Sequence, residues 1–354
     1  MDIQQIFSQA IHDEASDIFI VAGIPLSFKI HGEIRPVGDL LKPVDTESLL
    51  REIYQHASRD MQPLQETGDD DFSFSLRGIG RFRVNAYKQR GSLAAVLRIV
   101  LFELPDPVKL NIPTEVTGLY KKTKGLVLVT GPAGSGKSTT LACVIDQINQ
   151  HRNAHIITLE DPIEHIHHHQ KSIVSQREVA LDTVSYAKGL RAALRESPDV
   201  ILLGEMRDYE TISIAMSAAE TGQLVLSTLH TLGAANAIDR IIDVFPSSQQ
   251  QQVRVQLSMV LQSVISQQLI PAENGDLIPV FEVMFVNSAI RNMIRESKAH
   301  QIDSVIYASQ AEGMQSMDAE ILRLYQDGII SAETARYYSL NHDMVNKKIP
   351  DPKA

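Results

Sequence analysis

Apolar positions in the first hundred residues follow two kinds of spacing. Helical intervals separate Ile3, Ile6, Phe7, Ala10 and Ile11, which predicts an amphipathic helix over residues 2–15. A second helix is expected at 47–56. Short apolar runs predict strands at 18–21, 26–30, 72–76, 81–87 and 93–100. This mixture indicates an α+β domain over residues 1–102.

A proline-rich segment interrupts the pattern after residue 102. Residues 103–114, ELPDPVKLNIPT, hold three prolines, which fit neither a helix interior nor a central strand. The segment is therefore predicted to link two domains.

From Lys124 onward an apolar run, a loop and a helical stretch repeat in that order. Strands are predicted at 126–130, 156–159, 200–203 and 224–227, and helices at 137–150, 208–220 and 233–243. Because strands that alternate with helices form a parallel sheet covered by helices, residues 115–354 are expected to form an α/β domain.

The chain beyond Pro246 is expected to be mostly helical, over residues from about 247 to 354. A short β-like stretch around Ile278–Val286 interrupts it. The glutamines at 249–252 and 267–268 fall within the helical pattern and are expected on solvated faces.

Composition narrows the class of protein. The net charge is −10, so the chain as a whole is not built to lie along nucleic acid or anionic lipid. No apolar run approaches the 18 residues or more of a membrane-spanning helix, and the N-terminus lacks the features of a signal peptide. The single cysteine, Cys143, excludes an internal disulfide and a four-cysteine zinc site, and is expected to be packed. A cytoplasmic location is predicted.

One motif predicts nucleotide binding. Between an apolar strand and a helix, the sequence G-x-x-x-x-G-K-[ST] is matched by Gly131, Pro132, Ala133, Gly134, Ser135, Gly136, Lys137 and Ser138, followed by Thr139. The glycines let backbone N–H groups surround phosphates, Lys137 reaches the β- and γ-phosphates, and the Ser138 hydroxyl joins a Mg²⁺ shell. A glycine-rich turn without a ligand is disfavoured by this context. ATP and Mg²⁺ are thus the expected cofactors.

Acidic residues end two further predicted strands. Glu205 follows the strand 200–203, as in a Walker B motif, and can hold metal-bound water. The segment 158–164 places Glu160, Asp161 and Glu164 after another strand, where one carboxylate is a candidate general base for water. A solvated acidic turn is the alternative for this segment.

Histidines and arginines near these strands leave several possibilities open. His230 follows the strand 224–227 and could sense a γ-phosphate, although a structural histidine fits equally well. Hydrolysis commonly needs a guanidinium near the γ-phosphate, but spacing alone does not choose among Arg191, Arg195, Arg207 and Arg240. A metal site at the histidines of 165–169 is disfavoured, because no further ligands complete it.

The motifs, in this order, resemble the secretion ATPases of type II and type IV pilus systems over nearly the whole chain. Besides the Walker A sequence, the matching segments are ITLEDPIEH at 157–165, DVILLGEMRD at 199–208 and AAETGQLVLSTLHT at 218–231. The resemblance narrows to the motors that retract type IV pili. Two segments carry this narrower resemblance. They are the sequence EGMQSMD at 312–318 and the segment of Ala289, Ile290, Arg291, Asn292, Met293, Ile294, Arg295 and Glu296.

The resemblance implies a PAS-like N-terminal domain, a RecA-like ATPase core and a homohexameric ring. It implies that Glu164 activates water, that Glu205 supports Mg²⁺ and water, and that His230 contacts the phosphate region. Arginines delivered by a neighbouring domain or subunit make Arg81 and Arg83 candidates beside Arg195. The motor would act on a platform protein at the cytoplasmic face of the inner membrane, and indirectly on pilin, to support twitching motility.

Segment 289–296 admits two interpretations. Ile290, Met293 and Ile294 share one face of the expected helix, and Arg291 and Arg295 lie elsewhere around it. The charged side chains could transmit force to a neighbour or to the platform protein. A core-packing helix with solvated charges is the alternative.

Two residues depart from the family pattern. Gln223 stands where the family usually has a first histidine, and Phe19 replaces another histidine. Three other functions were weighed. A pilus-assembly or secretion ATPase usually carries a four-cysteine zinc insertion and an extra N-terminal domain, which this sequence does not show. A regulatory scaffold with little hydrolysis is disfavoured by the full set of motifs, and a DNA-translocating ring by the charge.

Overall fold

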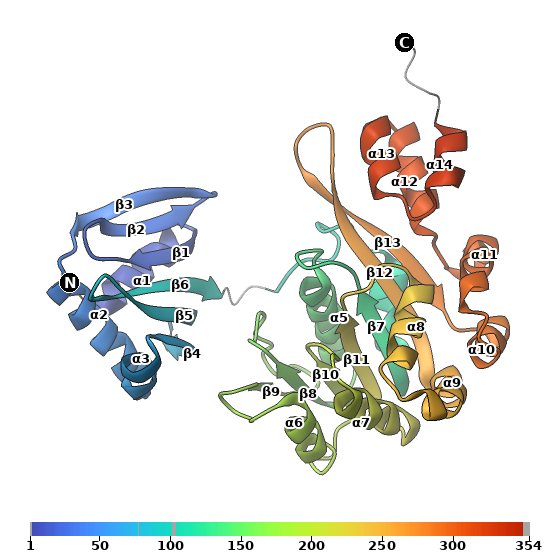
Figure 1. Ribbon diagram of the computed structural model, residues 1–354, viewed down its shortest axis with the longest axis horizontal. Coiled ribbons are helices and arrows are strands. Elements are labelled where there is room, and N and C mark those ends of the chain that lie inside the picture. Colours follow the sequence, from blue (N-terminus) through green and yellow to red (C-terminus); the bar gives the residue numbers. More distant parts are fainter. Residues whose placement is uncertain (1, 77, 101–103, 350–354) are drawn as a thin grey trace. The chain divides into compact units, whose positions relative to one another are not determined.

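The computed structural model describes residues 2–76, 78–100 and 104–349 (Figure 1). The chain divides into two units, one of residues 1–103 with 164–166 and one of residues 104–163 with 167–354. Each is described by itself below.

The first unit is built on an antiparallel six-stranded sheet in the order β3-β2-β1-β6-β5-β4. Its elements are α1 (Ile3–His12), β1 (Ala15–Ile20), β2 (Pro25–Ile30), β3 (Glu33–Leu40), α2 (Pro43–His56), α3 (Gln62–Thr67), β4 (Asp69–Leu76), β5 (Gly80–Gln89) and β6 (Ser92–Val100). Strand β3 was not predicted, because none of its residues is buried and its sequence lacks apolar alternation.

The apolar stripe of α1 forms part of this unit's core, as its spacing predicted. Ile3, Ile6 and Phe7 are buried, and the Phe7 ring stacks on Phe82 of β5 with ring centroids 4.2 Å apart. The PAS-like character of this unit stays a prediction.

The second unit contains a seven-stranded sheet in the order β13-β12-β7-β11-β10-β8-β9 (Figure 1). All neighbouring strands from β12 to β9 in this order are parallel to one another, and the edge strand β13 is antiparallel to β12. The strand bounds are β7 Gly125–Thr130, β8 His155–Glu160, β9 Ile173–Glu178, β10 Val200–Leu203, β11 Leu224–Leu229, β12 Leu261–Pro271 and β13 Leu277–Phe285. An α/β fold is thereby confirmed.

Helices cover both faces of this sheet. Leu126 and Leu128 of β7 belong to one core and Val127 and Val129 to another, because successive side chains of a strand point to opposite faces. The helices are α4 Thr114–Thr117, η1 Gly118–Lys121, α5 Lys137–His151, α6 Tyr186–Ala193, α7 Tyr209–Glu220, α8 Ala234–Asp243, α9 Ser247–Val260, α10 Ser288–Arg295, η2 Ala299–Gln301, α11 Ile302–Ala308, η3 Gln310–Glu312, α12 Met317–Gln326, α13 Ala332–Tyr338 and α14 His342–Lys348.

The β-like stretch predicted around Ile278–Val286 is confirmed as β13, but the helical prediction is wrong over β12, residues 261–271. Strands β12 and β13 form an antiparallel hairpin paired from Ser263–Phe285 to Pro271–Leu277. Both faces of β12 are buried, so its sequence lacks the polar–apolar alternation that marks a half-exposed strand. Gln267 and Gln268 were expected on a solvated helix face, but they are 3% and 5% exposed in this strand.

Residues 105–112, within the predicted linker, pack on the second unit. The Cys143 thiol of α5 donates to the carbonyl of Pro105 at 3.4 Å, and Ile112 is buried in the core beneath α5. Burial raises the pKa of Cys143 to about 12, so this thiol is packed and unreactive at neutral pH.

The C-terminal helices α12, α13 and α14 have a separate small core. Ile270 of β12 and Val280 of β13 enter it with Met317 and Ile321 of α12. The Asp318 carboxylate accepts hydrogen bonds from the backbone N–H groups of Leu340 and Asn341 at 2.6 and 3.0 Å, which joins α12 to the start of α14. Within the described ranges, no helix has the length and apolar character needed to cross a bilayer.

Candidate nucleotide site

The loop between β7 and α5 uses backbone conformations that favour glycine. The φ angle is +147° at Gly131, +76° at Gly134 and +86° at Gly136. A Cβ on Gly131 would lie 2.0 Å from the backbone carbonyl oxygen of Gln267, so a larger residue there would displace β12. The strand–loop–helix setting predicted for the phosphate-binding motif is therefore present.

Lys137 lies where a phosphate-binding lysine is needed. Its Nζ donates to the carbonyls of Gly131 and Pro132 at 3.0 and 2.7 Å, which places the cation inside the curve of the loop. Lys137 also begins α5, so the N–H groups of the first helical turn face the same space. The neighbouring Ser138 is exposed. The loop thus presents a cation, a helix N-terminus and a hydroxyl group to one ligand.

Three predicted residues from two motifs meet at the carboxyl edge of the sheet. The Glu205 carboxylate follows β10 and accepts a hydrogen bond from Arg207 Nε at 2.5 Å. His230 follows the adjacent strand β11, and its Nε2 lies 3.1 Å from the same Glu205 oxygen. The Glu205 side chain is 15% exposed, against 51% for His230. A mostly buried carboxylate therefore holds an accessible imidazole and an accessible guanidinium.

The neighbouring strand β8 adds negative charge. Glu160 at its end accepts hydrogen bonds from Thr158 Oγ1 at 2.6 Å and Gln176 Nε2 at 3.2 Å. The pKa of Tyr186 is raised above its usual range, first by burial and then by the carboxylates of Glu205, Asp161 and Glu160. A site with this surplus of carboxylates suits a divalent cation.

A divalent cation would be shared with a bound phosphate. Among the described residues, no group of three histidine, cysteine, aspartate or glutamate side chains could hold a metal alone. Mg²⁺ characteristically uses one or two protein oxygens together with substrate phosphates and water. Exposed Ser138 and partly accessible Glu205 could supply these protein oxygens.

Glu164 and the arginines are less closely tied to the loop. Glu164 is exposed beyond β8, and its role as a base stays a prediction. Arg195 and Arg240 are also exposed. Arg191 is paired with Glu210 of α7 at 2.5 Å, which gives it a structural partner.

In the first unit, Arg81 and Arg83 occupy alternate positions of β5. Arg81 donates to Ser75 and Ser73 of the neighbouring strand at 3.2 and 3.3 Å. Arg83 is exposed and lines a shallow cavity of about 350 Å³. Their action on a nucleotide stays a prediction.

The sequence analysis missed the residues beside the loop. A cavity of about 290 Å³ adjoins Gly136, Thr139 and Thr140. Its other lining residues are mostly apolar and come from the predicted linker and the β12–β13 hairpin, namely Lys109, Leu110, Asn111, Ile112, Gln267, Leu269, Leu277 and Pro279. An apolar cavity next to a phosphate loop suits the base of a nucleotide. No local motif marks these residues, because the fold brings them there from distant parts of the chain.

The segment Ala289–Glu296 contains helix α10 and its C-cap. Ile290 and Ile294 are buried in the main core. Arg291 Nη1 donates to the carbonyls of Ser258 and Met259 at 2.6 and 3.0 Å, at the end of α9. Arg291 therefore caps a helix, which favours the core-packing interpretation for this arginine. Arg295 is exposed and donates to Asn292 on its own helix.

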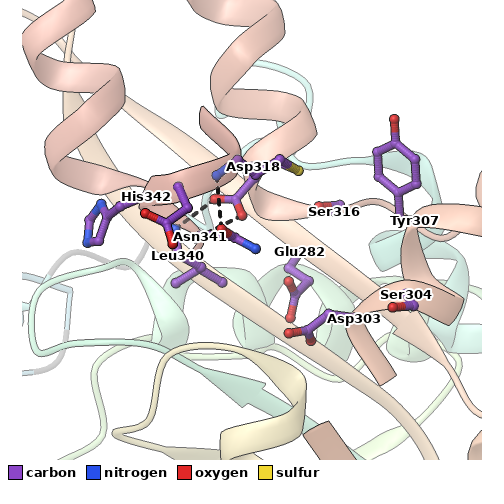
Figure 2. A pocket seen from close by; sticks show the side chains of 11 residues that line it. Glu282, Asp303, Ser304, Tyr307, Ser316, Asp318, Leu340, Asn341 and His342 are labelled. Carbon is purple, nitrogen blue, oxygen red and sulfur yellow. Dashed lines mark hydrogen bonds between the residues drawn. The ribbon is translucent and has the colours of Figure 1, made fainter. Parts of the chain in front are cut away.

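A third and larger cavity, of about 660 Å³, lies between β13 and helices α11, α12 and α14 (Figure 2). Figure 2 shows Glu282, Asp303 and Asp318 around it. Glu282 is 3% exposed, and its Oε1 accepts a hydrogen bond from the Ala234 N–H at 2.7 Å, at the start of α8. Burial is the main cause that raises the pKa of Glu282 to about 7.

An α/β sheet with a phosphate loop after its strand β7, and with an acidic edge beside it, defines a P-loop ATPase. The chain belongs to the family of type II/IV secretion system proteins, whose model matches residues 1–296.

Several relatives are similar over nearly their full length. The chain is 43% identical to a type IV pilus retractation ATPase, PilT, of Pseudomonas aeruginosa, covering 95% of this chain and 97% of the relative. It is also 43% identical to a twitching motility protein of Neisseria gonorrhoeae, covering 90% and 85% of the two chains. A crystal structure of the pilus retraction motor PilT with bound ADP superposes with a TM-score of 0.90 and 46% identity, covering 98% and 99%.

Proposed function

We propose that this chain is the ATP-driven motor that retracts type IV pili. The observation that carries ATP hydrolysis is the meeting of Glu205, His230 and Arg207 at the sheet edge that also bears the phosphate loop. The near full-length similarity to the pilus retraction ATPase of Pseudomonas aeruginosa supports the mechanical role.

Residues of the phosphate loop, the acidic segments and the strand ends divide the work of hydrolysis among them. Lys137 and the first turn of α5 bind the phosphates, and Ser138 and Glu205 hold Mg²⁺. When bound, Mg²⁺ neutralises charge on the phosphate oxygens. Glu205 also orients the His230 ring toward the phosphates through the 3.1 Å contact. Glu164 accepts the proton of the attacking water.

The active form is a homohexameric ring. Exposed Arg83, together with Arg81 or Arg195, offers the guanidinium that the γ-phosphate needs, and it can come from a neighbouring subunit. The ring acts from the cytoplasmic face of the inner membrane on the pilus platform protein, and through it on pilin. Nucleotide-driven movement within the ring supplies the work.

Two experiments test the proposal, one on ATP hydrolysis by the purified ring and one on pilus retraction in cells. Purified protein should release phosphate from ATP in the presence of Mg²⁺, and turnover per subunit should rise with protein concentration as rings form. Cells that lack the gene should extend pili but fail to retract them, and the intact gene should restore retraction. Unchanged retraction without the gene would reject the motor role, and a fully active monomer in light scattering would reject the ring.

A further inference from the structure

Gln267 of β12 is a buried amide held directly against the phosphate loop. It is 3% exposed. Its Oε1 accepts a hydrogen bond from Thr140 Oγ1 of α5 at 2.7 Å. Its backbone carbonyl packs against Gly131, and its Nε2 packs against Gly136, where a Cβ would lie 2.9 Å away. One residue therefore touches both ends of the loop and the helix that follows it.

The Gln267 amide has its oxygen toward Thr140, whose hydroxyl donates to it. Because the oxygen is occupied by the threonine hydroxyl, the Nε2 group lies on the side of Gly136 and the 290 Å³ cavity. Among the residues that the structure describes, none accepts a hydrogen bond from Nε2. Gln267 lines the cavity, so this donor is open to it and available for a ligand there.

The position of Nε2 narrows down the acceptor. Gly136 and Thr139 border the phosphate end of the cavity, whereas Leu269, Leu277 and Pro279 form its apolar wall. A nucleotide whose phosphates lie in the loop and whose base lies against that wall has its α-phosphate and ribose between them. Both groups present oxygen acceptors.

We propose that Gln267 is a nucleotide-binding residue whose Nε2 donates a hydrogen bond to an oxygen of the α-phosphate or the ribose. The inference rests on the proposed function, since it needs a nucleotide in the loop. It adds a contact to the nucleotide from β12, a strand that carries none of the phosphate-loop, acidic or histidine motifs. A neutral amide suits this place, because a carboxylate there would repel the phosphates.

The adjacent residue supplies a matched control. Gln268 is 5% exposed in the same strand, and its Nε2 donates to the carbonyl of Tyr338 in the C-terminal helices at 2.8 Å. Successive side chains of a strand point to opposite faces, so Gln268 faces away from the loop. Replacing it perturbs the strand to a similar degree without removing a donor from the cavity.

The test measures ADP binding by titration calorimetry on the full chain. Gln267→Glu keeps an acceptor for Thr140 and loses the donor, and Gln267→Met removes both polar groups without adding charge. We expect each to weaken ADP binding by a factor of about ten or more if the acceptor is the charged α-phosphate, and by a factor of about three to ten if it is a neutral ribose oxygen. Gln268→Met should bind ADP within a factor of about two of the wild type.

Three outcomes are decisive. Wild-type protein that does not bind ADP rejects the proposed function, whereas a wild type that binds and a Gln267→Met variant with unchanged affinity and a native circular dichroism spectrum reject this inference alone. Equal losses in Gln267→Met and Gln268→Met also reject it, because they indicate a general effect on β12. Titration with 2′-deoxy-ADP and 3′-deoxy-ADP distinguishes the acceptors. A variant penalty that vanishes with either analogue assigns that ribose hydroxyl, and one that persists with both assigns the α-phosphate or the ribose ring oxygen.

Discussion

Replacing Glu282 by glutamine should change how stability depends on pH. The group lies in the acidic cavity of Figure 2, where burial, and to a smaller extent Asp303 and Asp318, raise its pKa from 4.5 to about 7. The hydrogen bond from Ala234 acts in the opposite direction. The folded chain therefore keeps a proton on Glu282 at pH values where the unfolded chain has released it.

The sign follows from proton binding. Between pH 4.5 and about 7 the folded state binds more protons than the unfolded state, so the free energy of unfolding falls as the pH rises through this window. Two to three units of pKa at roughly 1.4 kcal/mol each give a loss of about 3 kcal/mol between pH 4.5 and pH 8. Glutamine mimics the protonated carboxyl group and can still accept from Ala234, so the variant should lack this loss.

Urea denaturation of the full chain at pH 5 and pH 8 measures the effect. The Glu282→Gln variant should gain about 2–3 kcal/mol over the wild type between the two conditions. Asp303, whose pKa is also raised by burial and by Asp318, is kept in both proteins. His342 and Asp343 also line the cavity and are kept in both. Exposed Glu273 in the hairpin turn supplies the control, since Glu273→Gln should leave the pH dependence unchanged. Parallel curves for Glu282→Gln and wild type would refute the reasoning.

Three further substitutions test the site and its surroundings. Lys137→Ala should remove measurable ADP binding in calorimetry while the protein stays folded, and tight binding would remove the lysine from the phosphate site. Glu164→Gln should bind ATP but release phosphate at least about 100-fold more slowly, because a general base contributes at least that factor. Turnover at the wild-type rate would assign the base to another residue. Arg291→Ala should lower the free energy of unfolding by about 1–3 kcal/mol by uncapping α9. Arg295→Ala should keep the wild-type stability and slow pilus retraction in cells. A stable Arg291→Ala and a destabilised Arg295→Ala would contradict the observed contacts.

Local patterns predicted the elements that depend on short stretches of sequence. The phosphate loop was found because its glycines and Lys137 lie within eight residues, and the conformations that need glycine follow from that spacing. Glu205 and His230 were each predicted from the end of a strand. Their contact depended on β10 and β11 being neighbours, which parallel pairing then supplied.

Contacts between distant segments could not be predicted in this way. Gln267 lies 127 residues from Thr140, and its strand is buried on both faces, so its apolar and polar positions resemble a helix as much as a strand. The capping role of Arg291 depends on α9 ending beside it, where Met259 lies 32 residues earlier in the chain. Each contact is set by tertiary packing, which a pattern within one segment does not contain.

The small core under helices α12–α14 implies that these helices can open locally while the rest of the fold stays intact. Apart from Ile270 of β12 and Val280 of β13, its buried residues all lie between Met317 and Ile349, and it is separate from the cores on the two faces of the sheet. Such a unit can open as a cooperative block while the sheet stays closed. Native-state hydrogen exchange should then show two levels of protection, with the amides of α12–α14 exchanging together well before those of β7 and β11.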